Sequence, residues 1–64
     1  MNNTKLTSVK LLKTLYEKFK VITINKSMTL QKLTNRSIDL YLTDDDFKNK
    51  IELHDNLMVS GSNL

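Results

Sequence analysis

The single histidine and its acidic neighbours are the side chains best suited to catalysis or metal binding. His54 stands between Glu52 and Asp55, and an imidazole beside carboxylates can act as a general base or as part of a metal site. The chain has no second histidine and no cysteine to complete a ligand set. We therefore interpret His54 as a surface residue and expect no enzyme activity, no metal and no cofactor.

Three consecutive aspartates, at positions 44–46, are a second group that could attract a cation. They follow Thr43, and Thr43 with Asp46 has the S/T-x-x-D spacing of a helix N-terminus. Carboxylates in the first turn of a helix are stabilised by the helix dipole. We interpret the aspartates as the start of a helix over residues 44–54, without an ion.

The charged residues divide the chain into a basic half and an acidic half. Residues 1–36 contain eight Lys or Arg and one Glu, a net charge of +7, whereas residues 37–64 contain two Lys and six Asp or Glu, a net charge of −4. A basic region on a small domain favours a polyanion such as nucleic acid, or a membrane surface. The apolar runs are too short for a membrane span. We expect a cytoplasmic, nucleoid-associated protein that does not enter membranes.

Sixty-four residues without cysteine or proline are near the lower limit for a chain that folds alone. Residues 5–11 alternate imperfectly between two faces, which predicts a short strand with no evident partner in the chain. A helix over residues 13–25 follows, because four apolar residues recur at helical spacing: Leu12, Leu15, Phe19 and Ile22. The four β-branched residues Val21–Ile24 leave helix and strand both open at its end, and Asn25 can adopt the left-handed conformation in the turn.

Residues 29–42 have the pattern of a second helix, with Thr29 as its N-cap. Its apolar residues form one stripe at Leu30, Leu33, Leu40 and Tyr41, and a second at Ile38 and Leu42. One small chain cannot cover so much apolar surface, so we expect a second copy of the protein to cover it. The predicted organisation is a flexible arm (1–4), one mainly α domain (5–55) and a polar tail (56–64).

This order of elements resembles the ribbon-helix-helix superfamily of Arc-, MetJ- and CopG-type DNA-binding proteins. The resemblance covers about residues 5–54. The segment Thr7–Leu11 followed by Leu15–Lys20 looks like the strand and first helix of that family, and Met28–Leu42 looks like its second helix. The family implies an intertwined homodimer, in which the strands of two copies form an antiparallel β-ribbon and the second helices pack across the dimer axis.

The resemblance also assigns roles to individual residues. The implied dimer core consists of Val9, Leu11, Leu15, Phe19, Leu30, Leu33, Ile38, Leu40 and Tyr41. The opposite face of the ribbon would carry the base contacts in the major groove, through Leu6, Ser8 and Lys10. The start of the second helix would hold the phosphate backbone. The expected phosphate contacts are Lys5, Lys13, Lys26, Ser27 and Thr29.

These inferences predict a small sequence-specific repressor, plasmid- or phage-associated, that binds double-stranded DNA as a homodimer and assembles cooperatively on it. A second hypothesis is an antitoxin or plasmid-partition adaptor, whose tail at 56–64 folds on a toxin or a partition ATPase. A third is a membrane-surface peptide, since Lys10–Lys20 is basic and partly amphipathic. The capped helices disfavour this third hypothesis, because a surface peptide needs no core.

Overall fold

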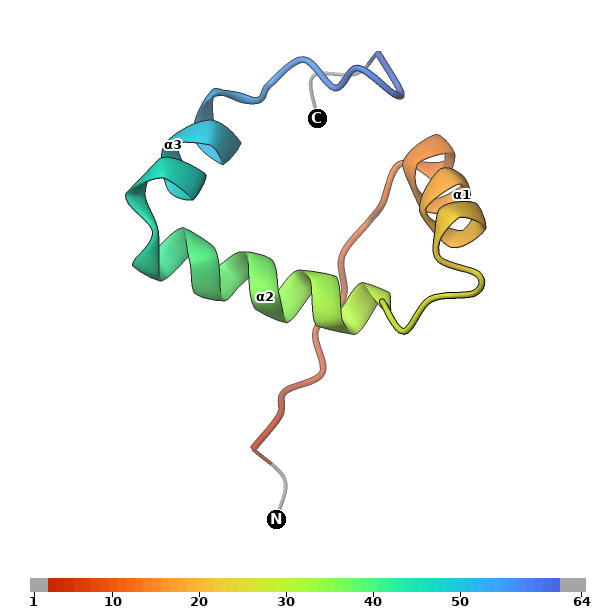
Figure 1. The fold of residues 1–64 in the computed structure, drawn as a ribbon, viewed down its shortest axis with the longest axis horizontal. Coiled ribbons are helices and arrows are strands. Elements are labelled where there is room, and N and C mark those ends of the chain that lie inside the picture. The colour runs from red at the N-terminus through yellow and green to blue at the C-terminus, as the bar shows by residue number, and fades with distance from the viewer. Residues whose placement is uncertain (1–2, 62–64) are drawn as a thin grey trace.

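The computed structural model describes residues 3–61, and it is built from helices (Figure 1). In the described residues, α1 spans Lys13–Ile22, α2 spans Leu30–Thr43 and α3 spans Asp45–Leu53. The mainly helical fold expected from the sequence is therefore confirmed. None of these helices has the length and apolar character needed to cross a bilayer.

Helix α1 is shorter than predicted. It ends at Ile22, so the prediction of a helix to residue 25 is wrong. The hydroxyl and the backbone N–H of Thr23 both donate to the Phe19 carbonyl, at 2.7 and 3.1 Å, and this closes the last turn. Of the β-branched residues Val21–Ile24, the first two are thus helical and the last two lie in the turn. Asn25 does not take the left-handed conformation, because no residue other than glycine has a positive φ in the described range.

Helix α2 begins as predicted. The Thr29 hydroxyl accepts a hydrogen bond from the Lys32 backbone N–H at 3.1 Å, which satisfies one of the free donors of the first turn. This confirms Thr29 as the N-cap. The helix continues through Thr43, one residue beyond the predicted end.

The start of α3 differs by one residue from the prediction. The cap is Asp44, whose Oδ1 accepts from the backbone N–H groups of Asp46 at 3.0 Å and Phe47 at 3.2 Å. Thr43 is still helical, and its hydroxyl donates to the Asp39 carbonyl at 2.8 Å, so the predicted Thr43 cap is wrong. A carboxylate accepts more strongly than a hydroxyl at the positive end of a helix. The helix also ends one residue early, at Leu53.

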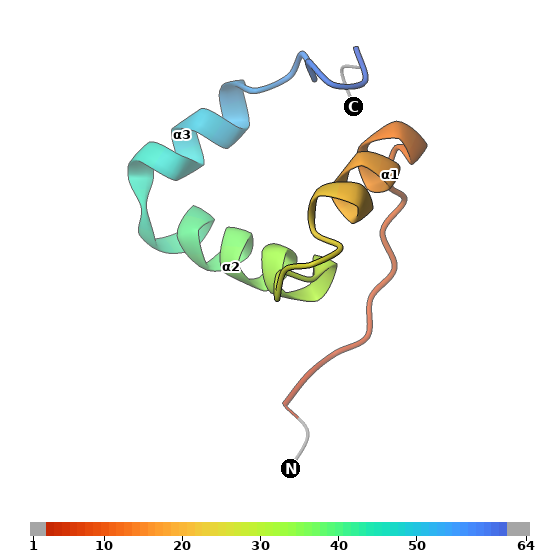
Figure 2. The ribbon, with the colours of Figure 1, turned by 45° about the vertical axis from the view of Figure 1, so that its right-hand side comes forward.

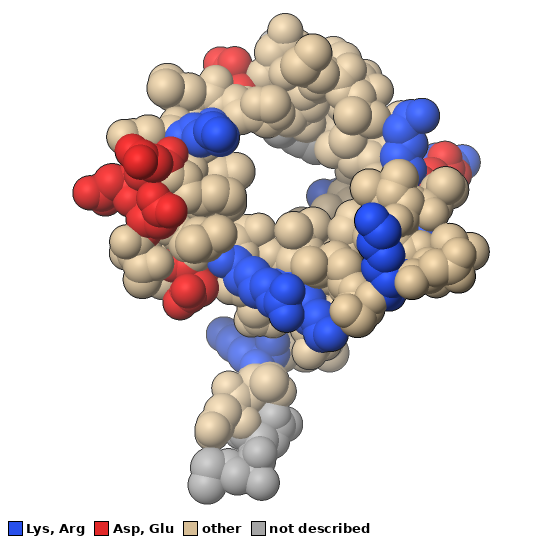
Figure 3. Space-filling model, in the orientation of Figure 1, with Lys and Arg blue, Asp and Glu red and all other residues tan. Residues whose placement is uncertain are grey.

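The helices surround a central opening, which the space-filling view in Figure 3 shows, instead of a core. Among the described helices, only α2 and α3 lie close enough for their backbones to be neighbours. Helix α1 stands across the opening from α3 (Figures 1 and 2). The radius of gyration is 13.4 Å, compared with about 11 Å for a compact domain of this length. No residue in the range 3–61 is buried. The single chain therefore leaves its apolar faces uncovered.

The predicted strand does not form in the single chain. Residues 3–12 contain neither helix nor strand and extend away from the helices (Figures 1 and 2). A strand needs an edge to pair with, and this segment lies beside none, so the intermolecular ribbon remains a prediction. Of the predicted arm and tail, residues 1–2 and 62–64 lie outside the described residues. Residues 58–61 form a turn, closed by a hydrogen bond from the Gly61 N–H to the Leu57 carbonyl at 2.6 Å.

Candidate nucleic-acid and dimer interface

The residues predicted to read bases all lie on the extended segment before α1. Leu6, Ser8 and Lys10 are exposed there, and Leu6 keeps 98% of its surface accessible. Val9, predicted to face inward, is also 73% exposed. Side chains on both faces of residues 5–11 are therefore exposed to solvent.

Three of the five residues predicted to hold phosphate lie just before the start of α2. Lys26, Ser27 and Thr29 lie together on the connection between α1 and α2 and are exposed. The Lys32 ammonium donates to the Ser27 carbonyl at 2.9 Å, and its own backbone N–H is held by Thr29. The Lys32 side chain therefore ties the start of α2 to the connection that precedes it.

Positive and negative side chains concentrate in different regions of the face shown in Figure 3. On this face the Lys and Arg residues lie mainly over α1 and along α2, with a further basic patch over α3, whereas the Asp and Glu residues gather mainly where α2 meets α3. The predicted phosphate contacts Lys5 and Lys13 precede or begin α1. On this face the basic half of the sequence is thus the more basic region of the folded chain.

The residues predicted to form the dimer core lie on three elements that do not enclose one another. Val9 and Leu11 are on the extended segment, Leu15 and Phe19 are on α1, and α2 carries the rest: Leu30, Leu33, Ile38, Leu40 and Tyr41. Leu15, Phe19 and Tyr41 are half-buried, and the other six are exposed. The structure does not assemble them into a core within one chain.

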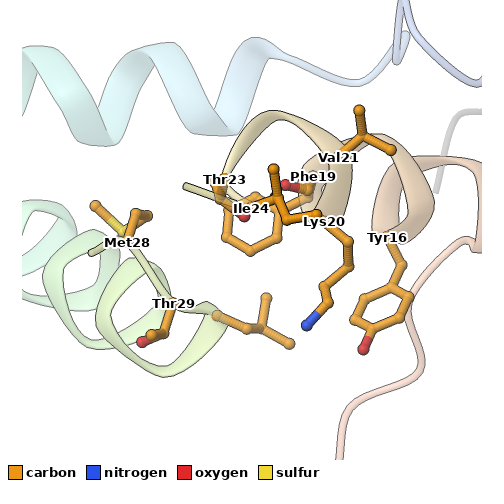
Figure 4. A pocket seen from close by; sticks show the side chains of 9 residues that line it. Tyr16, Phe19, Lys20, Val21, Thr23, Ile24, Met28 and Thr29 are labelled. Carbon is orange, nitrogen blue, oxygen red and sulfur yellow. The ribbon is translucent and has the colours of Figure 1, made fainter. Parts of the chain in front are cut away.

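An open cavity of about 420 Å³ lies between the end of α1 and the start of α2. Figure 4 shows Tyr16, Phe19 and Lys20 on one side of this cavity, and Met28 and Thr29 on the other. Val21 and Ile24 add exposed β-branched surface to the lining. The Lys20 ammonium lies 6.0 Å from the centroid of the Tyr16 ring. This cavity could not be predicted from the sequence, because it depends on how the connection after α1 folds back toward the start of α2.

A second cluster joins α2 to α3. The Tyr41 hydroxyl donates to a Glu52 carboxylate oxygen at 2.6 Å, and the Lys48 ammonium lies 5.8 Å from the centroid of the Tyr41 ring. The hydrogen bond to Glu52, with some desolvation and the charge of Glu52, raises the pKa of Tyr41 above its ordinary value. The Tyr41 side chain, predicted as dimer core, is thus engaged by α3 within its own chain.

The residues considered for chemistry lie at the two ends of α3. His54 follows the last turn of α3, and its backbone N–H donates to the Ile51 carbonyl at 3.2 Å. No three metal-ligating side chains come together within residues 3–61. Asp44 caps α3, and the Lys48 ammonium lies near the Tyr41 ring. The described residues present exposed backbone, apolar surface and positive charge, which are suited to binding another molecule.

Comparisons of the chain with protein-family models, with curated proteins and with solved structures found no match.

Proposed function

We propose that this protein is a homodimeric, sequence-specific DNA-binding protein of the ribbon-helix-helix kind, acting as a small transcriptional repressor. The observation that carries the proposal is the segment at residues 5–11, which extends in front of α1 with both faces exposed and contains Lys5 and Lys10. Unpaired backbone of this kind is suited to pairing with a second copy.

In this proposal the segments of two chains pair as an antiparallel ribbon that enters the major groove. Because alternate side chains of a strand point to opposite faces, Val9 and Leu11 face the helices while Leu6, Ser8 and Lys10 face the bases. A lysine can donate to O6 and N7 of guanine, and an apolar side chain can contact the methyl group of thymine. Lys10 therefore has the leading role in base recognition.

The start of α2 supplies the second contact in the proposal. Its free backbone N–H groups and positive dipole end favour a phosphate, and Lys26, Ser27 and Thr29 lie beside them. Such contacts fix the position of the protein on the duplex without reading sequence. The separation of charge supports this orientation, since the acidic junction of α2 and α3 would be repelled by the DNA backbone.

The test is to select bound sequences from random double-stranded DNA and then compare two lysine variants on the selected site. Lys10→Ala should weaken binding about 10-fold to 100-fold and relax the preference at one position, as expected for loss of a base contact. Lys50→Ala on α3 is the matched control, and it should change affinity less than about threefold. Equal losses for the two variants, or no selected sequence, would contradict the proposal.

An antitoxin or partition adaptor is the second candidate, and the observation that favours it is the exposure of the segment after α3. Met58 is 88% exposed in a segment that follows the last helix, and such apolar residues can order on a partner. This candidate requires that deletion of residues 56–64 abolish binding of a toxin or partition ATPase while DNA affinity stays the same.

A further inference from the structure

We propose that the junction of α2 and α3 is a two-state hinge, in which the corner at Asp44 straightens to give one continuous helix over residues 30–53. The straight form carries α3 away from Tyr41 and joins the apolar faces of the two helices into one long surface. This motion is separate from DNA binding. Three features support it: the hydrogen bonds at Asp44, the spacing of the apolar residues, and the few contacts that hold the corner.

The backbone of Asp44 already has helical hydrogen bonds on both sides. Its N–H donates to the Leu40 carbonyl at 2.8 Å, and its carbonyl accepts from the Lys48 N–H at 3.0 Å. Both bonds join residues four positions apart, as in an α-helix. The corner comes from this one residue, whose backbone is extended, with φ −124° and ψ 105°. Rotation of a single residue to helical angles therefore straightens the junction.

Straightening exchanges one set of hydrogen bonds for another. In the corner, the Asp44 carboxylate accepts from the backbone N–H groups of Asp46 and Phe47. In a continuous helix, the N–H groups of residues 45–47 would donate to the carbonyls of residues 41–43. The N–H groups of Asp46 and Phe47 thus have partners in either form, so the exchange leaves neither donor unsatisfied.

The apolar residues of α2 and α3 keep one register across Asp44. Alternating spacings of three and four connect positions 30, 33, 37, 40, 44, 47 and 51, and this repeat aligns side chains along one face of a continuous helix. Five of these positions are apolar: Leu30, Leu33, Leu40, Phe47 and Ile51. A corner does not require the register, because the backbone of Asp44 sets the rotation of α3 about its axis. The spacing therefore suits the straight form.

Few contacts hold α3 in the corner. The Tyr41 hydroxyl donates to Glu52 at 2.6 Å, and the Lys48 ammonium lies 5.8 Å from the centroid of the Tyr41 ring. No residue of α2 or α3 is buried, and Leu40 keeps 40% of its surface exposed, so straightening gives up little apolar burial. In a straight helix positions 41 and 52 would be about 16 Å apart. The corner therefore depends mainly on the Asp44 cap and the Tyr41–Glu52 hydrogen bond.

The distance between α2 and α3 within one chain distinguishes the two forms. The sequence has no cysteine, so spin labels can be attached at Gln31→Cys on α2 and Lys50→Cys on α3, two exposed positions. Labelled chains are mixed with an excess of unlabelled chains, and pulsed electron spin resonance then reports the distance within a chain. In a straight helix the two Cα atoms would be about 28 Å apart, and the corner seen in Figure 1 brings them closer.

Removing both contacts that hold the corner should straighten the junction. The double variant Asp44→Ala/Glu52→Ala loses the cap and the hydrogen bond, and alanine is more favourable than aspartate inside a helix. We expect the long distance to dominate in this variant with its helical circular dichroism retained, and the short distance to dominate in the unchanged chain. Asp39→Ala is the matched control, because position 39 is helical in both forms, and it should keep the short distance. A short distance in the double variant, loss of its helical signal, or a long distance in the control would overturn the proposal.

The pKa of Tyr41 provides a second measurement in single variants. The hydrogen bond to Glu52 raises this pKa, and straightening carries Glu52 away. Asp44→Ala should therefore lower the Tyr41 pKa toward its ordinary value, measured in a Tyr16→Phe background. Asp44→Asn removes the same charge but keeps a side-chain oxygen for the cap, so it should leave the pKa raised. Equal Tyr41 pKa values in the two variants would overturn the proposal, since loss of the cap would then leave the corner in place.

Discussion

Dilution is expected to unfold this protein, because its helices lack a core of their own. No residue between positions 3 and 61 is buried, and α2, the longest of the described helices, has 14 residues. Isolated helices shorter than about 15 residues are marginal in water. If a second copy supplies the missing burial, folding and association are one equilibrium, and the free energy of unfolding depends on protein concentration.

The size of the effect follows from mass action. For a dimer that dissociates as it unfolds, each tenfold dilution lowers the apparent free energy of unfolding by about 1.4 kcal/mol per dimer. A hundredfold dilution therefore removes about 2.7 kcal/mol. With a urea dependence of about 2 kcal/mol per molar for a unit of this size, the midpoint moves down by about 1.4 M urea.

The assay is urea unfolding followed by circular dichroism at total chain concentrations of about 1 and 100 µM, a range chosen to span the hundredfold dilution worked above. Sedimentation equilibrium on the same samples gives the number of chains in the folded unit. A midpoint that is the same at both concentrations, with full helical signal, would show that the chain folds alone. That result would refute the reasoning from missing burial, and the dimer with it.

Three further predictions concern the helix ends and the junction of α2 with α3. Thr29→Ala and Asp44→Ala should each lower the free energy of unfolding by about 1 kcal/mol in urea, while Thr29→Ser and Asp44→Asn retain most of it; losses unchanged by these milder replacements would contradict the capping roles. Glu52→Ala should lower the pKa of Tyr41 toward its ordinary value, measured by absorbance at 295 nm in a Tyr16→Phe background. The raised pKa means that the hydrogen bond stabilises the junction fully below pH 10, and that this contribution is lost as pH rises through the Tyr41 pKa and the phenolate forms beside Glu52. An unchanged Tyr41 pKa in Glu52→Ala would contradict the role given to Glu52.

The features that could be predicted from sequence are those decided by neighbouring residues. Thr29 was identified as a cap because its hydroxyl and the N–H that it binds are three positions apart. The predicted start of α3 is wrong by one residue, because Thr43 and Asp44 are adjacent and both side chains can accept hydrogen bonds. Spacing alone does not show which of the two caps the helix. The end of α1 could not be predicted, because the β-branched residues at positions 21–24 are compatible with both helix and strand. In the structure the Thr23 hydroxyl donates to the Phe19 carbonyl and closes the last turn.

The features that could not be predicted join distant parts of the chain or require another molecule. Tyr41 and Glu52 are 11 positions apart on different helices, and no periodicity places one beside the other. The cavity is lined by α1, by the connection that follows it and by Leu30 at the start of α2, and its shape depends on the path of that connection. The segment at residues 5–11 has strand-like alternation but lies beside no strand edge in the described chain, so alternation alone does not predict its conformation.

The two connections between helices differ in how much change they should tolerate. Residues 23–29 join α1 to α2 with seven positions, so an insertion there lengthens a loop at small entropic cost. Asp44 alone joins α2 to α3: its N–H closes the last turn of one helix at 2.8 Å from the Leu40 oxygen, and its carboxylate opens the next. One inserted residue at this point would rotate α3 about its axis and separate Glu52 from Tyr41. The connection between α1 and α2 should therefore tolerate changes in length, whereas the connection between α2 and α3 should not.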